Sequence, residues 1–225
     1  MDQIDKNTVK AKGQLKATNY VTFFQTEGEG KRVMFVGNSI TRHGILHDIG
    51  WHQDWGMAAS DISKDYVHLL AEKISSLEKD PAFCVCQVAA WEKDYKTITD
   101  YTPWESARDF GADLIFLRLI ENAPKKEFDP AKFKEQLHTL RQYLDPTGRA
   151  EIIIGTSFWK HVGDPVLTEY AKEQGIPLIY MGDLGEDDEN KAIGLFEHDG
   201  VASHPGDLGM QRIADRFFEC YQKNK

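Results

Sequence analysis

Two residues of this sequence could together perform nucleophilic chemistry. Ser39 lies in Val36-Gly37-Asn38-Ser39-Ile40-Thr41, directly after a short apolar run, and His204 directly precedes the last helical segment. A serine at a sharp turn after a strand presents its hydroxyl at the end of the sheet, and Gly37 permits the tight backbone path. The hydroxyl becomes a good nucleophile when a base such as histidine takes its proton. Each residue alone also has an ordinary explanation, Ser39 as a turn residue and His204 as a loop histidine.

A third candidate group follows the apolar run Asp113–Leu119. Asn122 could donate an amide N–H to an oxyanion, or it could be an asparagine that the turn favours. Arg118 is a charge at the end of an apolar run, so it needs a partner, which Glu121 or Glu92 could supply. We interpret Arg118 as part of the architecture of the site, and we place it with Asn38 and Glu121 among the substrate-binding residues.

The segment His43–Met57, HGILHDIGWHQDWGM, is expected to be a loop that faces the site. Trp51 and Trp55 could offer aromatic faces to a sugar or an acyl group. A rival reading is a metal site built from the cluster His43, His47, Asp48, His52 and Asp54, since two histidines on one helical turn can chelate. Gly44 weakens a helix there. The third reading is a structural loop that covers the edge of the core.

The rest of the chain alternates short apolar runs with helical patterns. The runs that predict buried strands are Arg32–Val36, Phe83–Val88, Asp113–Leu119, Glu151–Ile154 and Pro177–Met181. The patterns that predict the main helices are Ile62–Leu77, Lys132–Leu144, Val166–Gln174 and Leu208–Tyr221. Five such units predict an α/β fold with a mostly parallel five-stranded sheet between helices. Its site would lie beyond the carboxyl ends of the strands, where Ser39, Asn122 and His204 all fall.

Composition limits the class of protein. The chain has 225 residues and a formal net charge of −9, which argues against nucleic acid as a partner. No apolar run is long enough to suggest a membrane span, and the polar first residues do not resemble a secretory signal. Three cysteines without such a signal favour a reducing, cytoplasmic location. We expect the α/β domain to cover 31–225, and an extra strand or a partner-binding arm to cover 1–30.

Taken together, the three positions resemble the motifs of the SGNH (GDSL-like) hydrolase superfamily. Gly37-Asn38-Ser39 stands for its Gly-Asp-Ser block, Asn122 for its later asparagine, and His204-Pro205 for its terminal His-Pro. The resemblance runs from Arg32 to the C-terminus and implies a flavodoxin-like three-layer sandwich and acyl-ester hydrolysis without a cofactor or metal. It also implies an oxyanion hole from the Ser39 N–H, Asn122 and a second-block donor, for which Trp91 is the nearest match.

The sequence departs from that family where the acid of a catalytic triad is expected. The residue three positions before His204 is Val201, whose side chain cannot orient the ring. Either a backbone carbonyl of Val201 or a neighbour accepts the ring N–H, which makes a Ser–His dyad, or Asp199 supplies the carboxylate. Glu197 is a poorer version of the second idea, and we favour Asp199 slightly.

The expected function is therefore that of a serine esterase acting on a small acyl ester, with an O-acetylated carbohydrate as the preferred substrate. Two other functions stay open. One is a metal-dependent hydrolase that uses the loop His43–Asp54, and the other is a non-catalytic module that binds a ligand on the same fold.

Overall fold

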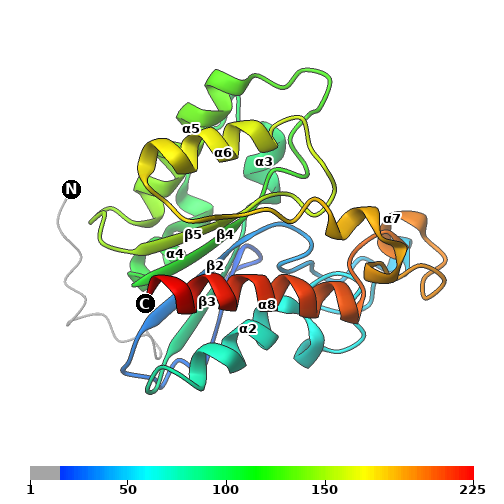
Figure 1. Cartoon of the computed structure of the whole chain (residues 1–225), viewed down its shortest axis with the longest axis horizontal. Coiled ribbons are helices and arrows are strands. Elements are labelled where there is room, and N and C mark those ends of the chain that lie inside the picture. Colours follow the sequence, from blue (N-terminus) through cyan, green and yellow to red (C-terminus); the bar gives the residue numbers. More distant parts are fainter. Residues whose placement is uncertain (1–15) are drawn as a thin grey trace.

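One sheet lies at the centre of residues 16–225, which are the residues that the computed structural model describes (Figure 1). The strand order is β1-β3-β2-β4-β5-β6. The strands are β1 (Val21–Phe24), β2 (Arg32–Gly37), β3 (Ala82–Gln87), β4 (Leu114–Arg118), β5 (Glu151–Gly155) and β6 (Leu178–Ile179). Strands β2 to β6 pair in parallel, so the five parallel strands expected from the apolar runs are confirmed.

The order of the parallel strands is that of a flavodoxin-like sheet. Along the chain the five parallel strands take the spatial order 2-1-3-4-5, so the direction of progress reverses between β2 and β4. In such sheets a ligand binds beyond the carboxyl ends of the strands at this reversal. Ser39 follows β2 and Asn122 follows β4, and Gly37 pairs with Arg118 in the register of the two strands. Topology alone therefore brings the two candidate residues to one place.

The sixth strand comes from the segment before residue 31. β1 pairs antiparallel with β3, and Val21 lies opposite Cys86 at the edge of the sheet. The sequence allows either an extra strand or a partner-binding arm in the first thirty residues, and Val21–Phe24 form an extra strand. The sheet therefore begins before the expected domain boundary at residue 31. Residues 1–15 lie outside the described part of the chain, so the structure does not address an arm there.

Helices cover both faces of the sheet (Figure 1). The α-helices are α2 (Tyr66–Ser75), α3 (Ala89–Asp94), α4 (Glu105–Phe110), α5 (Pro130–Leu144), α6 (Asp164–Gln174), α7 (Asp199–Ala202) and α8 (Asp207–Asn224). The short 3-10 turns are η1 (His47–Ile49), η2 (Ile62–Lys64), η3 (Thr102–Trp104), η4 (Leu184–Glu186) and η5 (Asp188–Asn190). Asp129, followed by Pro130, accepts a hydrogen bond from the Lys132 N–H and so caps the start of α5.

The strands alternate their side chains between two cores. Phe35 and Phe116 point to the layer formed by α2 and α8, where they pack with Phe217. Val36 and Leu117, one residue further along, point to the layer of α3 to α6. Because both faces are buried, the strands read as continuous apolar runs rather than as an alternating pattern.

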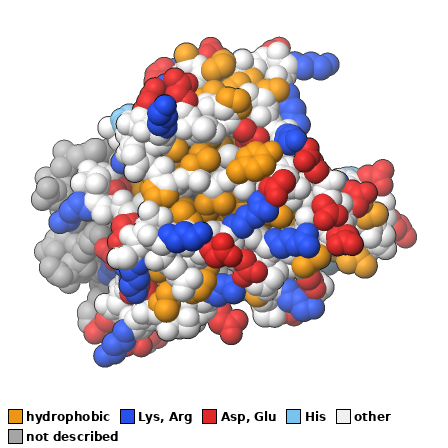
Figure 2. Space-filling model, viewed as in Figure 1, with side chains coloured by type: hydrophobic (Ala, Val, Ile, Leu, Met, Phe, Trp, Pro, Cys, Tyr) orange, Lys and Arg blue, Asp and Glu red, His pale blue; other side chains and the backbone are white. Residues whose placement is uncertain are grey.

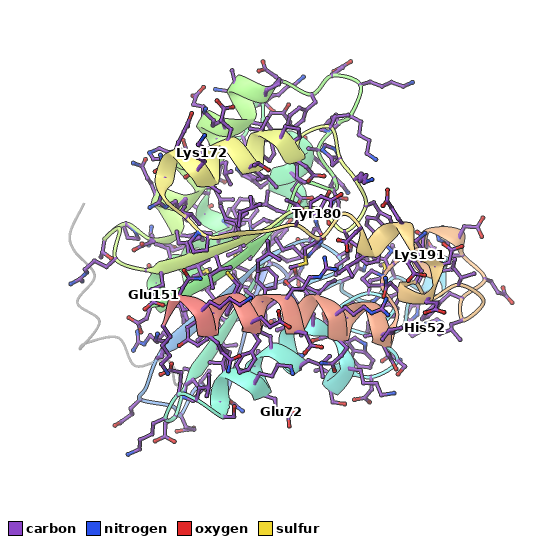
Figure 3. All side chains as sticks on the ribbon, viewed as in Figure 1. His52, Glu72, Glu151, Lys172, Tyr180 and Lys191 are labelled. Atoms are coloured by element: carbon purple, nitrogen blue, oxygen red, sulfur yellow. The ribbon has the colours of Figure 1, made fainter. Side chains whose placement is uncertain are left out.

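Two long loops form a lobe beyond the carboxyl ends of the strands. The loop 43–58 and the segment 190–203 meet around a small separate core, and its buried members are Trp51, Met57, Ala58, Ala192 and Val201. The labelled side chains of His52 and Lys191 lie at this end of the molecule (Figure 3). Acidic side chains gather on the same end, near α7 (Figure 2). We call this region the distal lobe. Across residues 16–225, no helix combines the length and the apolar character that crossing a membrane requires.

Candidate active site

The turn that carries Ser39 requires a glycine. A Cβ atom on Gly37 would lie 2.0 Å from the Thr41 hydroxyl oxygen and 2.5 Å from the Arg118 carbonyl oxygen, so no larger residue fits between β2 and β4 here. The turn closes through the Asn38 carbonyl, which accepts the N–H groups of Thr41 and Arg42 at 2.9 Å each. Ser39 therefore stands half-buried on a fixed turn at the end of β2.

The hydroxyl of Ser39 faces the ring of His204. Ser39 Oγ lies 2.8 Å from His204 Nε2, and His204 Nδ1 lies 2.6 Å from the carbonyl oxygen of Gly200. A carbonyl only accepts, so Nδ1 must carry the proton and donate it. The unprotonated Nε2 then faces Ser39 as an acceptor. This is the tautomer in which histidine can act as a base toward the serine hydroxyl.

Desolvation keeps the ring of His204 uncharged. Burial of the imidazole lowers its pKa to about 4, although the hydrogen bond to the Gly200 carbonyl acts in the opposite direction. The charge of the nearby His43 also lowers this pKa. Near neutral pH the ring is therefore uncharged, which is the protonation state that a general base requires.

The acceptor for His204 is thus a peptide carbonyl. Gly200 lies within α7, whose single turn begins at Asp199 and directs the Gly200 carbonyl at the ring. Asp199 itself is exposed, and among the described residues no hydrogen bond joins its carboxylate to His204. Glu197 is exposed as well. The triad with Asp199 that we favoured from the sequence does not describe this geometry, whereas the alternative with a backbone acceptor near Val201 does. The physical reason is that the chain between Asp199 and His204 folds into a helical turn, which turns a carbonyl toward the ring.

A buried polar network lies beneath Ser39. Asn38 donates from Nδ2 to Glu92 Oε1 at 2.9 Å and to Glu121 Oε2 at 2.6 Å, and its Oδ1 accepts from Arg118 Nη2 at 2.8 Å. Arg118 also forms an ion pair with Glu121 through Nη1. Asn122 donates to Glu92 Oε2 from its backbone N–H at 2.9 Å and from Nδ2 at 2.6 Å. Side chains from three strand ends are therefore joined into one cluster.

The two carboxylates of this network differ in their surroundings. Burial and the negative charge of Glu121 raise the pKa of Glu92 to about 7. Burial acts in the same direction on Glu121, but the Arg118 guanidinium and the Phe158 N–H outweigh it, so the pKa of Glu121 lies below its usual range. Glu121 is therefore an anion that Arg118 neutralises, whereas Glu92 relies on neutral N–H donors.

The network changes the roles expected for Asn38, Arg118 and Glu121. Asn38 and Arg118 are fully buried. Asn38 bonds to Arg118 and to both carboxylates, and Arg118 bonds to Asn38 and Glu121 through its two terminal nitrogens while its buried Nε has no hydrogen-bond partner among the described residues. Glu121 accepts from Asn38, Arg118 and the Phe158 N–H. We therefore assign these three residues to the support of the site rather than to substrate contact. Arg118 does have the partner Glu121 that its position in an apolar run demands.

The tryptophans expected at the site lie mainly inside the protein. Trp51 is 1% exposed and packs in the core of the distal lobe, where its Nε1 donates to the His43 carbonyl at 3.0 Å. Trp55 is half-buried, packs edge-on against Trp51 and donates to the Ala59 carbonyl. The aromatic rings therefore pack the loop 43–58 against the segment 190–203. In this structure Trp51 and Trp55 fit the interpretation of the loop as a structural cover. The Trp91 ring is buried against Phe133, which leaves only its backbone N–H for an oxyanion.

Sequence reasoning missed one aromatic residue of the site. Trp159 follows β5 and its half-buried ring meets the His204 ring edge-on, with centroids 5.0 Å apart and planes 82° apart. It also underrated Glu92, which entered only as a possible partner for Arg118. Both residues follow strands of the sheet by a few positions, which is the one signal in the sequence that could have singled them out.

Two histidines of the distal lobe, His47 and His52, pair with each other. Nδ1 of His47 and Nδ1 of His52 are 2.7 Å apart, which is a hydrogen-bond distance. Asp54 pairs with Arg42 at 2.8 Å. Within residues 16–225, no three His, Cys, Asp or Glu side chains are grouped so that they could hold a metal ion. The expectation that no metal takes part stays a prediction, which chelation can test.

Comparisons with known proteins agree on the fold. No protein-family model matches the sequence, and no curated protein matches it significantly. Among solved structures, it is similar to a salicylyl-acyltransferase from a tetracycline biosynthetic pathway, with a TM-score of 0.58 and 18% identity over 87% of this chain and 55% of the other. It is also similar to a two-domain esterase active on acetylated mannans, with a TM-score of 0.55 and 13% identity over 86% of this chain and 48% of the other.

A further match is a member of the lipolytic protein G-D-S-L family from Veillonella parvula, with a TM-score of 0.48 and 14% identity over 86% of this chain and 99% of that protein. The chain spans about half the length of the acyltransferase and of the mannan esterase. At these identities the likeness concerns the fold alone. The 2-1-3-4-5 parallel sheet and the matches to the acyltransferase and the mannan esterase, both with TM-scores above 0.5, show that this chain shares a flavodoxin-like α/β fold with those two proteins.

Proposed function

We propose that this chain is a serine esterase in which Ser39 is the nucleophile and His204 is the general base. The observation that carries the proposal is the 2.8 Å contact between Ser39 Oγ and His204 Nε2 at the carboxyl ends of the strands. The ring is neutral near pH 7, and the bond from Nδ1 to the Gly200 carbonyl holds it in the acceptor tautomer. A serine and a base within hydrogen-bond reach, with the base oriented by a third group, form the arrangement that nucleophilic catalysis requires.

The proposed reaction has two halves. His204 takes the hydroxyl proton as Ser39 Oγ attacks the ester carbonyl, which gives a tetrahedral oxyanion. His204 then gives that proton to the departing alcohol oxygen, and the acyl group stays on Ser39. In the second half, His204 deprotonates a water molecule, which attacks the acyl carbonyl of the acyl-enzyme. The bond from the acyl carbon to Ser39 Oγ then breaks, His204 returns the proton to Oγ, and the acid is released. No cofactor enters either half.

Two donors stand ready for the oxyanion in this proposal. One is the backbone N–H of Ser39 at the start of its turn. The other is the Asn122 amide, whose nitrogen carries two hydrogens; one is held by Glu92, and the second is available to a substrate oxygen. The N–H of Trp91, in the first turn of α3, stays the candidate for a third donor. One such donor can contribute roughly 3 kcal/mol in the transition state.

The substrate class proposed is a small acyl ester, in particular an O-acetylated carbohydrate. The esterase with the same fold that acts on acetylated mannans supports this class. The half-buried Trp159 ring beside His204 supports it too, because an aromatic face at the rim of a site suits the apolar face of a sugar. The proposed partner is thus a small molecule.

Hydrolysis of p-nitrophenyl acetate tests the catalytic proposal. Ser39→Ala should lower kcat by at least about 10³-fold, because the remaining groups cannot supply a nucleophile. The matched control is Ser76→Ala at the exposed end of α2, which should keep the activity of the wild type. Full activity in Ser39→Ala would contradict the proposal. Release of acetate from acetylated mannan, compared with release from acetylated amino sugars, then tests the substrate class.

A further inference from the structure

Glu92 occupies an unusual position for a carboxylate. It lies in the short helix α3, directly after β3, and none of its surface is exposed. Its two oxygens accept from four nitrogen atoms, and these are Asn38 Nδ2 at 2.9 Å, the Ile120 N–H at 2.7 Å, the Asn122 N–H at 2.9 Å and Asn122 Nδ2 at 2.6 Å. Nearly all of the acceptor capacity of a carboxylate is used by these bonds.

The bonds of Glu92 fix a strained turn. Ile120 has a φ of 109°, a conformation that a β-branched residue adopts only when its surroundings impose it. Glu92 accepts hydrogen bonds from the N–H of Ile120 itself and from the N–H of Asn122, two residues later. From the other side, His161 Nε2 donates to the carbonyl of Ala123 at 3.0 Å. The position of Asn122 is therefore set by contacts outside its own turn.

The same carboxylate ties the nucleophile turn to the Asn122 turn. Glu92 Oε1 accepts from Asn38, the residue that precedes Ser39, and Oε2 accepts from the Asn122 amide. An amide at position 92 could not do this, because its NH2 group would face N–H donors on one side. The nearest charged groups are Glu121 and Arg118, and Arg118 pairs with Glu121 rather than with Glu92. Glu92 thus stabilises this region as a hydrogen-bond acceptor, not as half of an ion pair.

We propose that Glu92 is a positioning residue for catalysis, whose carboxylate holds the Asn122 amide in the direction that meets the oxyanion formed at Ser39. Glu92 touches neither the substrate nor the reacting atoms and acts through Asn122. The proposal rests on the serine esterase function proposed above, because it needs an oxyanion at Ser39.

The first test is a double-mutant cycle in kcat for p-nitrophenyl acetate. Glu92→Gln should lower kcat by about 10- to 100-fold with KM within about twofold, as loss of an orienting partner does at other sites. In an Asn122→Ala background, the same change should cost less than about twofold, because its effect passes through Asn122. Glu127→Gln, on an exposed loop, is the matched control and should be unchanged. Equal losses in both backgrounds would overturn the proposal.

The second test is the pH dependence of kcat/KM, and its decisive outcome is read from the wild type, so a variant that fails to fold does not leave the proposal untested. Because the ionised carboxylate is the form that accepts four N–H groups, activity should fall as the pH drops through about 7, where Glu92 gains a proton. The kcat/KM profile should show this ionisation near pH 7 in the wild type and lose it in Glu92→Gln. A wild-type profile that is flat from about pH 5 to 8 would overturn the proposal. An inactive wild type that no serine probe labels would instead reject the esterase function itself.

Discussion

The orientation of His204 by a peptide carbonyl has a sharp consequence for Asp199. We expect Asp199→Asn to keep kcat/KM for p-nitrophenyl acetate within about fivefold of the wild type. In a true triad, loss of the carboxylate lowers kcat by about 10⁴-fold, which corresponds to roughly 5.5 kcal/mol. Here Nδ1 is 2.6 Å from the Gly200 carbonyl, so the bond that fixes the tautomer survives the substitution.

The substitution then removes only the long-range electrostatic effect of the exposed Asp199 charge on the reaction rate. In water two unit charges a few ångströms apart interact by only about 1 kcal/mol, which is about a fivefold change in rate. The assay is initial-rate kinetics at about pH 7.5, with Glu197→Gln as the matched exposed carboxylate. A fall of about a thousandfold in Asp199→Asn, with Glu197→Gln unaffected, would refute the dyad. It would mean that the distal lobe rearranges in solution and brings Asp199 to the ring.

Three further predictions concern the donor, the base and the turn of this site, and a fourth concerns metal. Asn122→Ala should lower kcat by roughly 10²-fold or more with little change in KM, in steady-state kinetics; a change in KM alone would make Asn122 a ground-state contact. In the Glu92→Gln variant, kcat/KM should stay level down to about pH 4 and fall below it, because protonation of His204 removes the acceptor for the Ser39 proton; a limb near pH 6.5 would contradict the burial of the ring. Gly37→Ala should lower the free energy of unfolding by about 1–3 kcal/mol in denaturant titration, since the added methyl meets backbone and side-chain oxygens; unchanged stability would argue against the tight turn. Activity should survive EDTA, and loss of activity that zinc restores would favour the metal-dependent rival.

The layout of the site follows from patterns that a sequence displays well. Continuous apolar runs mark strands that are buried on both faces, and the parallel order places the residues after β2 and β4 side by side. Ser39 and Asn122 could therefore be located from the order of the apolar runs alone. His204 could be paired with Ser39 because it directly precedes the helix that packs back on the sheet. β1 was harder, since four residues with mixed burial carry a weak signal.

The residues that could not be predicted depend on contacts between distant segments. Trp51 reads as a site residue in the sequence, but the segment 190–203 covers it in the core of the distal lobe. The acceptor for His204 depends on whether residues 199–202 form a helical turn, and that turn is too short to leave a periodic pattern. Glu92 looks like an ordinary charge in a helix, and its importance depends on bonds to residues up to 54 positions away. The cytoplasmic location and the absence of a nucleic-acid partner stay predictions from composition.

The identity of the nucleophile is the centre of this account, and labelling with a fluorophosphonate probe tests it most directly. The intact protein would be treated with the probe, digested, and the modified peptide located by mass spectrometry in the wild type, Ser39→Ala and Ser76→Ala. We expect the probe on Ser39 in the wild type and in Ser76→Ala, with no labelling in Ser39→Ala. Labelling at another serine, or none in a folded wild type, would contradict the assignment of Ser39 and His204 as the catalytic pair.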